Sequence, residues 1–131
     1  MSAPWQALLA VGWAIVGPPL IVYAAAQVRR GRVGRHAVLL GAAACIELFV
    51  VLSFGRIASP HPRRALLEAL PVFTIHLAFA YATLAGIAWQ LGSRAVPRLR
   101  GLHRHTGPYV ALVWVLALVT GIYNFVFIYL L

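Results

Sequence analysis

The sequence contains very few acidic side chains and almost no sulfur ligands. Glu47 and Glu68 are the only acids among 131 residues, Cys45 is the only cysteine and Met1 the only methionine. A lone cysteine excludes a disulfide framework, and the shortage of soft ligands argues against a copper site of the usual thiolate or thioether kind. No paired carboxylates, nucleophile–base pair or glycine-rich phosphate loop is visible, so the sequence disfavours a conventional enzyme.

Charge of either sign is also scarce. Charged residues make up 10% of the chain and hydrophobic residues 63%, whereas soluble domains average about 25% charged residues. The formal net charge of +9 comes from arginines. These arginines stand between apolar runs and form no basic stripe, so the expected partner is a lipid bilayer and not nucleic acid.

Four long apolar runs take up most of the chain. Each reaches the ~17–25 residues that a helix needs to cross the hydrocarbon layer. Short connections predict an up-down-up-down arrangement, giving an all-α, polytopic membrane protein with one domain over residues 1–131. The first run lacks a basic leading segment and is too long for a signal peptide, so we expect it to be retained. The runs are Trp5–Gln27, Ala37–Phe54, Leu66–Leu91 and Tyr109–Leu131.

The arginines predict the orientation in the membrane. Four follow the first run, four follow the third, and three lie between the second and third. Because cytoplasmic loops carry the excess of basic residues, both termini are expected outside the cytoplasm, in a bacterial cytoplasmic membrane. The three groups are Arg29, Arg30, Arg32 and Arg35; Arg94, Arg98, Arg100 and Arg104; and Arg56, Arg63 and Arg64.

Several local patterns predict how the helices pack. Two consecutive prolines predict a bend in the first helix, and small residues at four-residue spacing predict close helix–helix contacts in the last two. Two deep tryptophans are expected to line the interior, and a Thr-Gly-Pro sequence is expected to cap the fourth helix. The residues are Pro18 and Pro19; Ala78, Ala82 and Gly86; Ala117 and Gly121; Trp13 and Trp114; and Thr106 to Pro108.

Glu47 and His76 are both expected near the middle of the bilayer, about 16 Å from the ends of their helices. An isolated ionised glutamate at that depth costs at least ~2.5–3.5 kcal/mol. One way to remove the cost is a Glu47–His76 pair, which could act as a proton relay or orient a ligand-bearing residue. The alternative is a neutral Glu47 bonded to Thr74, Thr83 or a tyrosine.

Five histidines are spread along the chain. His36, His103 and His105 lie at the predicted cytoplasmic side, His76 lies inside the third run, and His61 lies in the outer loop. Histidines on different helices of a bundle can hold haem iron or a metal, so all five are candidate cofactor ligands, with His36, His76 and His103 as the metal set. The alternative is that histidines and arginines simply mark the membrane interface.

The chain resembles the YozB/CtaM-like family of small four-helix bacterial membrane proteins, from about His36 to the C-terminus. The resemblance rests on the residues that open the second run, on the sequence around His76, and on spaced motifs around the fourth run. A histidine that closes the second helix in the family has no exact counterpart here. The matching segments are His36–Ala43, Ile75-His76-Leu77, His103-Arg104-His105, Trp114 and Val119-Thr120-Gly121-Ile122.

One branch of that family is linked to cytochrome oxidase maturation. The resemblance therefore implies a histidine-lined site for haem b, or for copper or zinc, in a protein that assists assembly of a respiratory haem-copper oxidase, with oxidase subunits as partners. A b-type cytochrome in electron transfer and a non-catalytic small subunit of a respiratory complex are the alternatives. A homodimer is compatible with each of these functions, whereas the absence of any cofactor is compatible only with the assembly and small-subunit functions.

Overall fold

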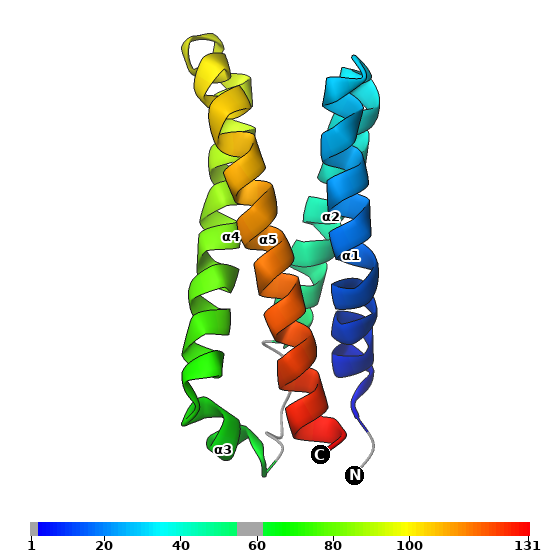
Figure 1. Ribbon diagram of the computed structural model, residues 1–131, viewed down its shortest axis with the longest axis vertical. Coiled ribbons are helices and arrows are strands. Elements are labelled where there is room, and N and C mark those ends of the chain that lie inside the picture. The colour runs from blue at the N-terminus through cyan, green and yellow to red at the C-terminus, as the bar shows by residue number, and fades with distance from the viewer. Residues whose placement is uncertain (1–2, 55–61) are drawn as a thin grey trace.

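The computed structural model describes residues 3–54 and 62–131, and the regular structure of these residues is helical throughout. Four helices are long and apolar enough to cross a membrane, as predicted. Figure 1 shows them side by side, with both termini at one end of the bundle. The elements are α1 (Trp5–Arg29), α2 (Val33–Phe54), α3 (Arg64–Glu68), α4 (Pro71–Ala95), the 3-10 helix η1 (Pro97–Leu99) and α5 (Arg100–Tyr129).

The third apolar run is divided into two helices. Leu70 has an extended backbone with ψ 140°, and Pro71 follows it as the first residue of α4. A residue before proline is driven out of the helical region, whereas proline itself suits the first helical turn. The short α3 is therefore separate from the long α4, and the prediction of one helix from Leu66 is wrong at its start.

The fourth long helix begins well before the predicted Thr-Gly-Pro cap. α5 starts at Arg100 and continues through Pro108. The Thr106 hydroxyl donates to the Leu102 carbonyl oxygen at 2.8 Å, which is a bond inside a helix and not an N-cap. Since proline lacks only its own N–H, the helix can pass through this position with a local distortion.

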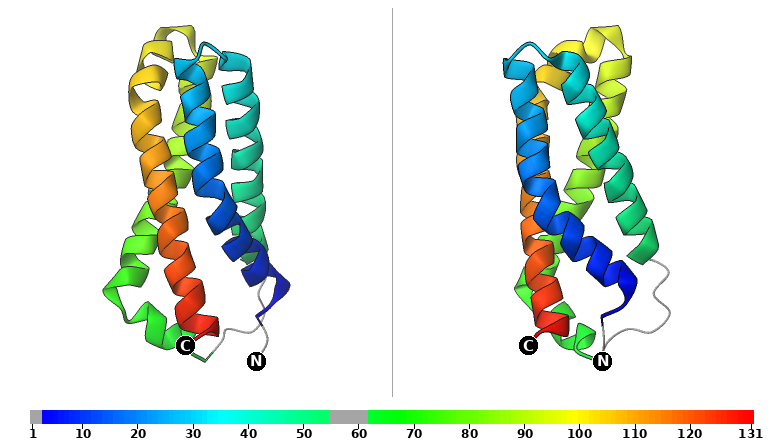
Figure 2. Two further views of the ribbon diagram at one scale, coloured as in Figure 1. Left: turned by 45° about the vertical axis from the view of Figure 1, so that its right-hand side comes forward. Right: turned by 90° about the vertical axis from the view of Figure 1, so that its right-hand side faces the viewer.

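The long helices associate as two pairs, α1 with α2 and α4 with α5, and contacts between α1 and α5 join the pairs. Figures 1 and 2 show the same arrangement from three sides. A direct Glu47–His76 pair needs α2 to pack against α4, and this packing is not among the main helix contacts of the described residues. Figure 2 also shows that α1 bends, as its internal Pro18 and Pro19 predict.

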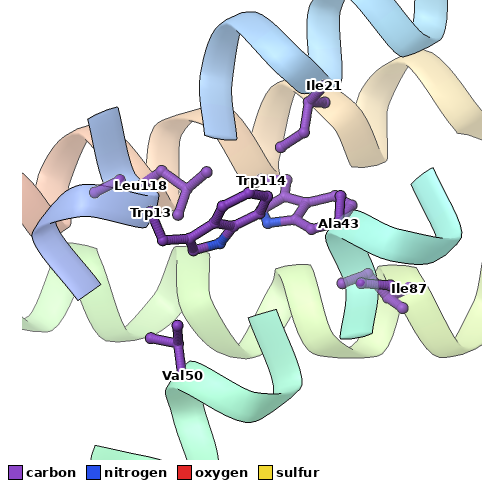
Figure 3. Close-up of a cluster of buried hydrophobic side chains, with 9 residues drawn as sticks. Trp13, Ile21, Ala43, Val50, Ile87, Trp114 and Leu118 are labelled. Carbon is purple, nitrogen blue, oxygen red and sulfur yellow. The ribbon is translucent and has the colours of Figure 1, made fainter. Parts of the chain in front are cut away.

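A buried cluster draws side chains from all four long helices (Figure 3). Trp13 and Trp114 are 6% and 3% exposed, so the prediction that they line the interior is confirmed. By contrast, large apolar side chains such as Val38, Tyr81 and Leu112 point outward, as expected for helices that face lipid. The cluster consists of Trp13, Ala14, Ile21, Ala43, Ala44, Val50, Ile87, Trp114 and Leu118.

Close approach of helices depends on two glycines. A Cβ added at Gly86 would lie 2.8 Å from a Val110 methyl carbon, and one added at Gly17 would lie 2.7 Å from Leu118 Cδ1. Gly86 therefore forms the predicted small-residue contact of α4 with α5. Ala78 and Ala82, predicted to belong to the same seam, are exposed instead.

Candidate functional site

A carboxylate held by two tryptophans lies in the middle of the bundle. Glu47 of α2 is only 8% exposed. Its Oε2 accepts a hydrogen bond of 2.7 Å from Trp13 Nε1 of α1 and another of 2.8 Å from Trp114 Nε1 of α5. Three helices thus meet at one oxygen atom, and the surrounding cluster supplies an apolar wall.

We call the arrangement of Trp13 and Trp114 around Glu47 the Trp13–Glu47–Trp114 clamp. It holds the carboxyl group in place and determines which of its two oxygens could carry a proton. Two indole N–H donors occupy the lone pairs of Oε2, so Oε1 is the oxygen on which a proton would be carried. Donors on a carboxylate offset part of the cost of removing it from water. The indoles keep their donor role in either protonation state, because an indole N–H can only donate. Glu47 can therefore gain or lose a proton on Oε1 without breaking its two supports.

His76 lies on α4 and is held by α5. Its Nδ1 is 3.0 Å from Thr120 Oγ1, and the Thr120 hydroxyl itself donates to the Leu116 carbonyl oxygen at 2.8 Å. When the Thr120 hydroxyl donates to the Leu116 carbonyl oxygen, its own oxygen accepts a hydrogen bond from His76 Nδ1–H. The ring packs beside Gly121, where an added Cβ would lie 3.4 Å from Cε1. In this arrangement the neutral His76 ring has its acceptor lone pair on Nε2.

The hydrogen bonds that Glu47 and His76 form differ from those expected. The Glu47 oxygen is bonded to tryptophans, and His76 is bonded to Thr120. Neither a direct Glu47–His76 pair nor a bond from Glu47 to Thr74, Thr83 or a tyrosine is formed among the described residues. Counting residues along the sequence predicted a similar depth for both groups. It could not predict which side chains of the other helices would contact them, because that depends on the rotation of each helix about its axis.

Thr83 is a further polar group in this part of the bundle. It is 1% exposed, and its hydroxyl has no hydrogen-bond partner within the described residues. Thr83 stands one turn before Ile87, and Glu47 stands one turn after Ala43; Figure 3 shows Ala43 and Ile87 near each other. Since α2 and α4 run in opposite directions (Figure 1), these one-turn offsets put Thr83 and Glu47 at about the same level.

Two of the three histidines near the arginine-rich turns, His36 and His103, lie within hydrogen-bond distance of a neighbouring helix. His36 Nδ1 lies 3.0 Å from the Ala24 carbonyl oxygen of α1, and His103 Nδ1 lies 3.0 Å from the Gln90 carbonyl oxygen of α4. A carbonyl oxygen can only accept, so His36 carries its hydrogen on Nδ1 and presents the Nε2 lone pair. His105 is exposed.

The expected metal set is not assembled by the fold. No group of three potential ligand side chains that could hold a metal ion occurs in residues 3–54 and 62–131. His36 belongs to the α1–α2 pair, His103 to the α4–α5 pair, and His76 lies deeper on α4. His61, also named as a candidate ligand, lies outside the described residues. The donors present therefore do not fit a three-histidine metal site.

The tryptophan donors are the functional residues that the sequence did not predict. Their burial was expected, but their role in holding Glu47 was not. A signal was present, because a buried tryptophan usually directs its N–H to an acceptor, and Glu47 was the acid expected at that depth. The missing information was the rotation of α1 and α5 about their axes.

Comparison of the chain with known protein families, with curated proteins and with solved structures finds no match. The fold and the site define its class by themselves: an all-helical protein with four helices long enough to span a membrane, enclosing a buried carboxylate.

Proposed function

We propose that this chain crosses a bacterial cytoplasmic membrane four times, up-down-up-down, with both termini outside the cytoplasm. The length and apolar surface of the four helices support this placement. The termini lie together at the end opposite the turns that carry the two groups of four arginines (Figure 1). Cytoplasmic loops collect arginine, so those turns face the cytoplasm.

Within that membrane, the protein acts as a non-enzymatic proton-relay partner of a respiratory complex. The observation that carries this proposal is the Trp13–Glu47–Trp114 clamp. Ionisable groups inside membrane helices are costly and commonly mark proton pathways. Glu47 is the group that exchanges the proton, at Oε1, and the His76 imidazole is the next proton carrier of the relay. The family resemblance points to a haem-copper oxidase as the complex it assists.

Proton exchange at Glu47 can be observed directly, because the chain contains only two carboxyl side chains. In infrared difference spectra of the reconstituted protein, recorded between two pH values, we expect a buried carboxylic C=O band with a small deuterium shift. Glu47→Gln removes this band, whereas Glu68→Gln, which alters the exposed Arg64–Glu68 pair, retains it. A spectrum in which no band depends on Glu47 would make the clamp purely structural.

A second candidate function is the handling of haem at the arginine-rich end. It is favoured by the geometry of His36, since ligand histidines commonly donate to a carbonyl oxygen through one ring nitrogen and bind the iron or metal through the other. His36 and His103 lie on α2 and α5 near the same end of the bundle. Bound haem would supply one-electron chemistry there, as a b-type cytochrome or as haem in transit to an oxidase.

Absorption spectra of the detergent-purified protein test this candidate. If these histidines hold haem, the dithionite-reduced protein shows sharp α and β bands, and His36→Gln and His103→Gln each abolish them. His105→Gln, a change at an exposed neighbouring histidine, leaves them unaltered. If the protein stays colourless after haem supplementation, haem handling is rejected. It is also rejected for these residues if the absorption bands remain in both the His36→Gln and the His103→Gln variants.

A further inference from the structure

A hollow opens on the outer face of the α1–α2 pair, close to the arginine-rich turns. It has a volume of about 440 Å³ and is lined by Tyr23 of α1 and by Gly34, Arg35, Val38 and Leu39 of α2. The hollow is open to the outside, so it suits a molecule that lies along the helix surface and not one that is enclosed. Its walls differ in chemistry from one end to the other, which indicates what kind of molecule it suits.

The end of the hollow nearest the turn suits an anion. Arg35 is exposed there, and Gly34 lies in the first turn of α2, which begins at Val33. The first turn of a helix presents backbone N–H groups and the positive end of the helix dipole. Gly34 has no side chain to cover them, and a Cβ added to it would meet nothing within 4 Å. A phosphate could approach both the guanidinium and the backbone.

The deeper end of the hollow suits a hydrocarbon chain. Val38 and Leu39 lie one turn further along α2, and Val38 is 72% exposed. Tyr23 stands across from them on α1 with about half of its surface exposed. An anion-binding end followed by an apolar wall, at the level where a helix leaves the membrane, matches a phospholipid headgroup and its acyl chain.

Charge at this end of the molecule is positive and uncompensated by acids. The eight arginines of the two turns lie at the same end of the molecule as the hollow. Both acidic side chains lie elsewhere: Glu47 is buried in mid-bundle, and Glu68 is bonded to Arg64 of α3 at 2.7 Å. Figure 1 shows α3 at the opposite end. Basic pockets between membrane helices on the cytoplasmic side are typical sites for anionic lipid headgroups.

We propose that the Tyr23–Gly34–Arg35–Val38–Leu39 hollow binds one anionic phospholipid, with the phosphate at Arg35 and the α2 N-terminus and an acyl chain along Val38 and Leu39. The inference rests on the proposed membrane location and is independent of the roles of Glu47 and the histidines. The neutral headgroup of phosphatidylcholine lacks the net charge that the site selects.

Native mass spectrometry of the detergent-purified chain, titrated with phosphatidylglycerol or phosphatidylcholine, tests the site. The wild-type chain should retain one phosphatidylglycerol in preference to phosphatidylcholine. Arg35→Gln should weaken phosphatidylglycerol binding about fivefold, the effect of one arginine at a membrane surface. The matched control is Arg104→Gln, which removes an exposed arginine near the same end but outside the hollow and should change binding little.

A second variant keeps every charge. Gly34→Leu places a side chain over the α2 N-terminus, where there is open space, so it should fold normally and also lose the bound lipid. If Arg35→Gln and Arg104→Gln weaken phosphatidylglycerol binding equally, the proposed site is wrong and the lipid is held by non-specific electrostatic attraction. The same conclusion follows if Gly34→Leu leaves lipid binding unchanged. Full displacement of the lipid by inorganic phosphate would also overturn the proposed site, since the acyl chain would then contribute nothing.

Failure of the membrane placement gives a different result. If carbonate washing releases the chain from bacterial membranes, the proposed location is rejected and the lipid site with it. If the chain stays in the membrane while lipid binding ignores both Arg35 and Gly34, the lipid site alone is rejected.

Discussion

Glu47→Leu should be among the most destabilising single changes in this chain. Leucine removes the acceptor from two buried indole N–H groups, those of Trp13 and Trp114. An unsatisfied buried donor costs about 1–3 kcal/mol, so the two together should lower the free energy of unfolding by about 2–6 kcal/mol. Glu47→Gln keeps a carbonyl oxygen in the same place and should cost less than half as much. Unfolding in mixed detergent micelles, followed by circular dichroism, measures both.

The matched control is Glu68→Leu. Glu68 is the other acid of the chain and forms a solvent-exposed pair with Arg64, a kind of interaction that contributes about 0–1 kcal/mol. Replacing Glu68 by leucine should leave the free energy of unfolding nearly unchanged. If Glu47→Leu were as mild as Glu68→Leu, the two hydrogen bonds would not be holding the three helices together.

Gly86→Val should separate α4 from α5. The first added carbon already lies 2.8 Å from one Val110 methyl carbon and 3.0 Å from the other. Val110 is branched at Cβ and cannot turn away freely, so the helix backbones themselves must move. Overpacking of this kind costs about 1–3 kcal/mol, and the same unfolding measurement should detect it as a lower denaturation midpoint.

Gly92→Val provides the comparison on the same helix. Its added Cβ would meet nothing within 4 Å, while the change in helix propensity is shared with Gly86→Val. The difference between the two variants therefore isolates the contact with Val110. Equal stability of the two would mean that α4 and α5 do not depend on close approach at Gly86.

The existence of the four long helices was predictable because each apolar run has the length that a membrane-spanning helix requires. Their ends were less predictable, since they depend on local backbone conformation. The extended Leu70 before Pro71 separates α3 from α4, and a proline expected to open α5 lies inside it. A proline that suits a first turn can also be tolerated within a helix, so its presence alone does not fix a boundary.

The depth of the candidate site along the helices was predictable from the sequence, but the side chains that contact one another there were not. Counting residues along the helices located Glu47 and His76 near mid-bundle, and both are partly or largely buried there. Which side chain meets which depends on the rotation of each helix, and rotation follows from packing of the whole cluster. Trp13 and Trp114 therefore took the place expected for His76. The same rotation ties His36 to α1 and His103 to α4, and no group of three potential metal ligands forms among the described residues.

The three partners of the clamp are far apart along the chain, which has a consequence for biosynthesis. Trp13 precedes Glu47 by 34 residues, and Trp114 follows it by 67. A ribosome therefore completes the α1–α2 pair while Glu47 has one donor in place, and the second donor arrives only with α5. Until then the Glu47 carboxyl group has only the Trp13 donor, and its second hydrogen bond forms when α5 packs against α1. A chain that ends before Trp114 would lack this second donor and would leave the buried carboxyl group with half of its support.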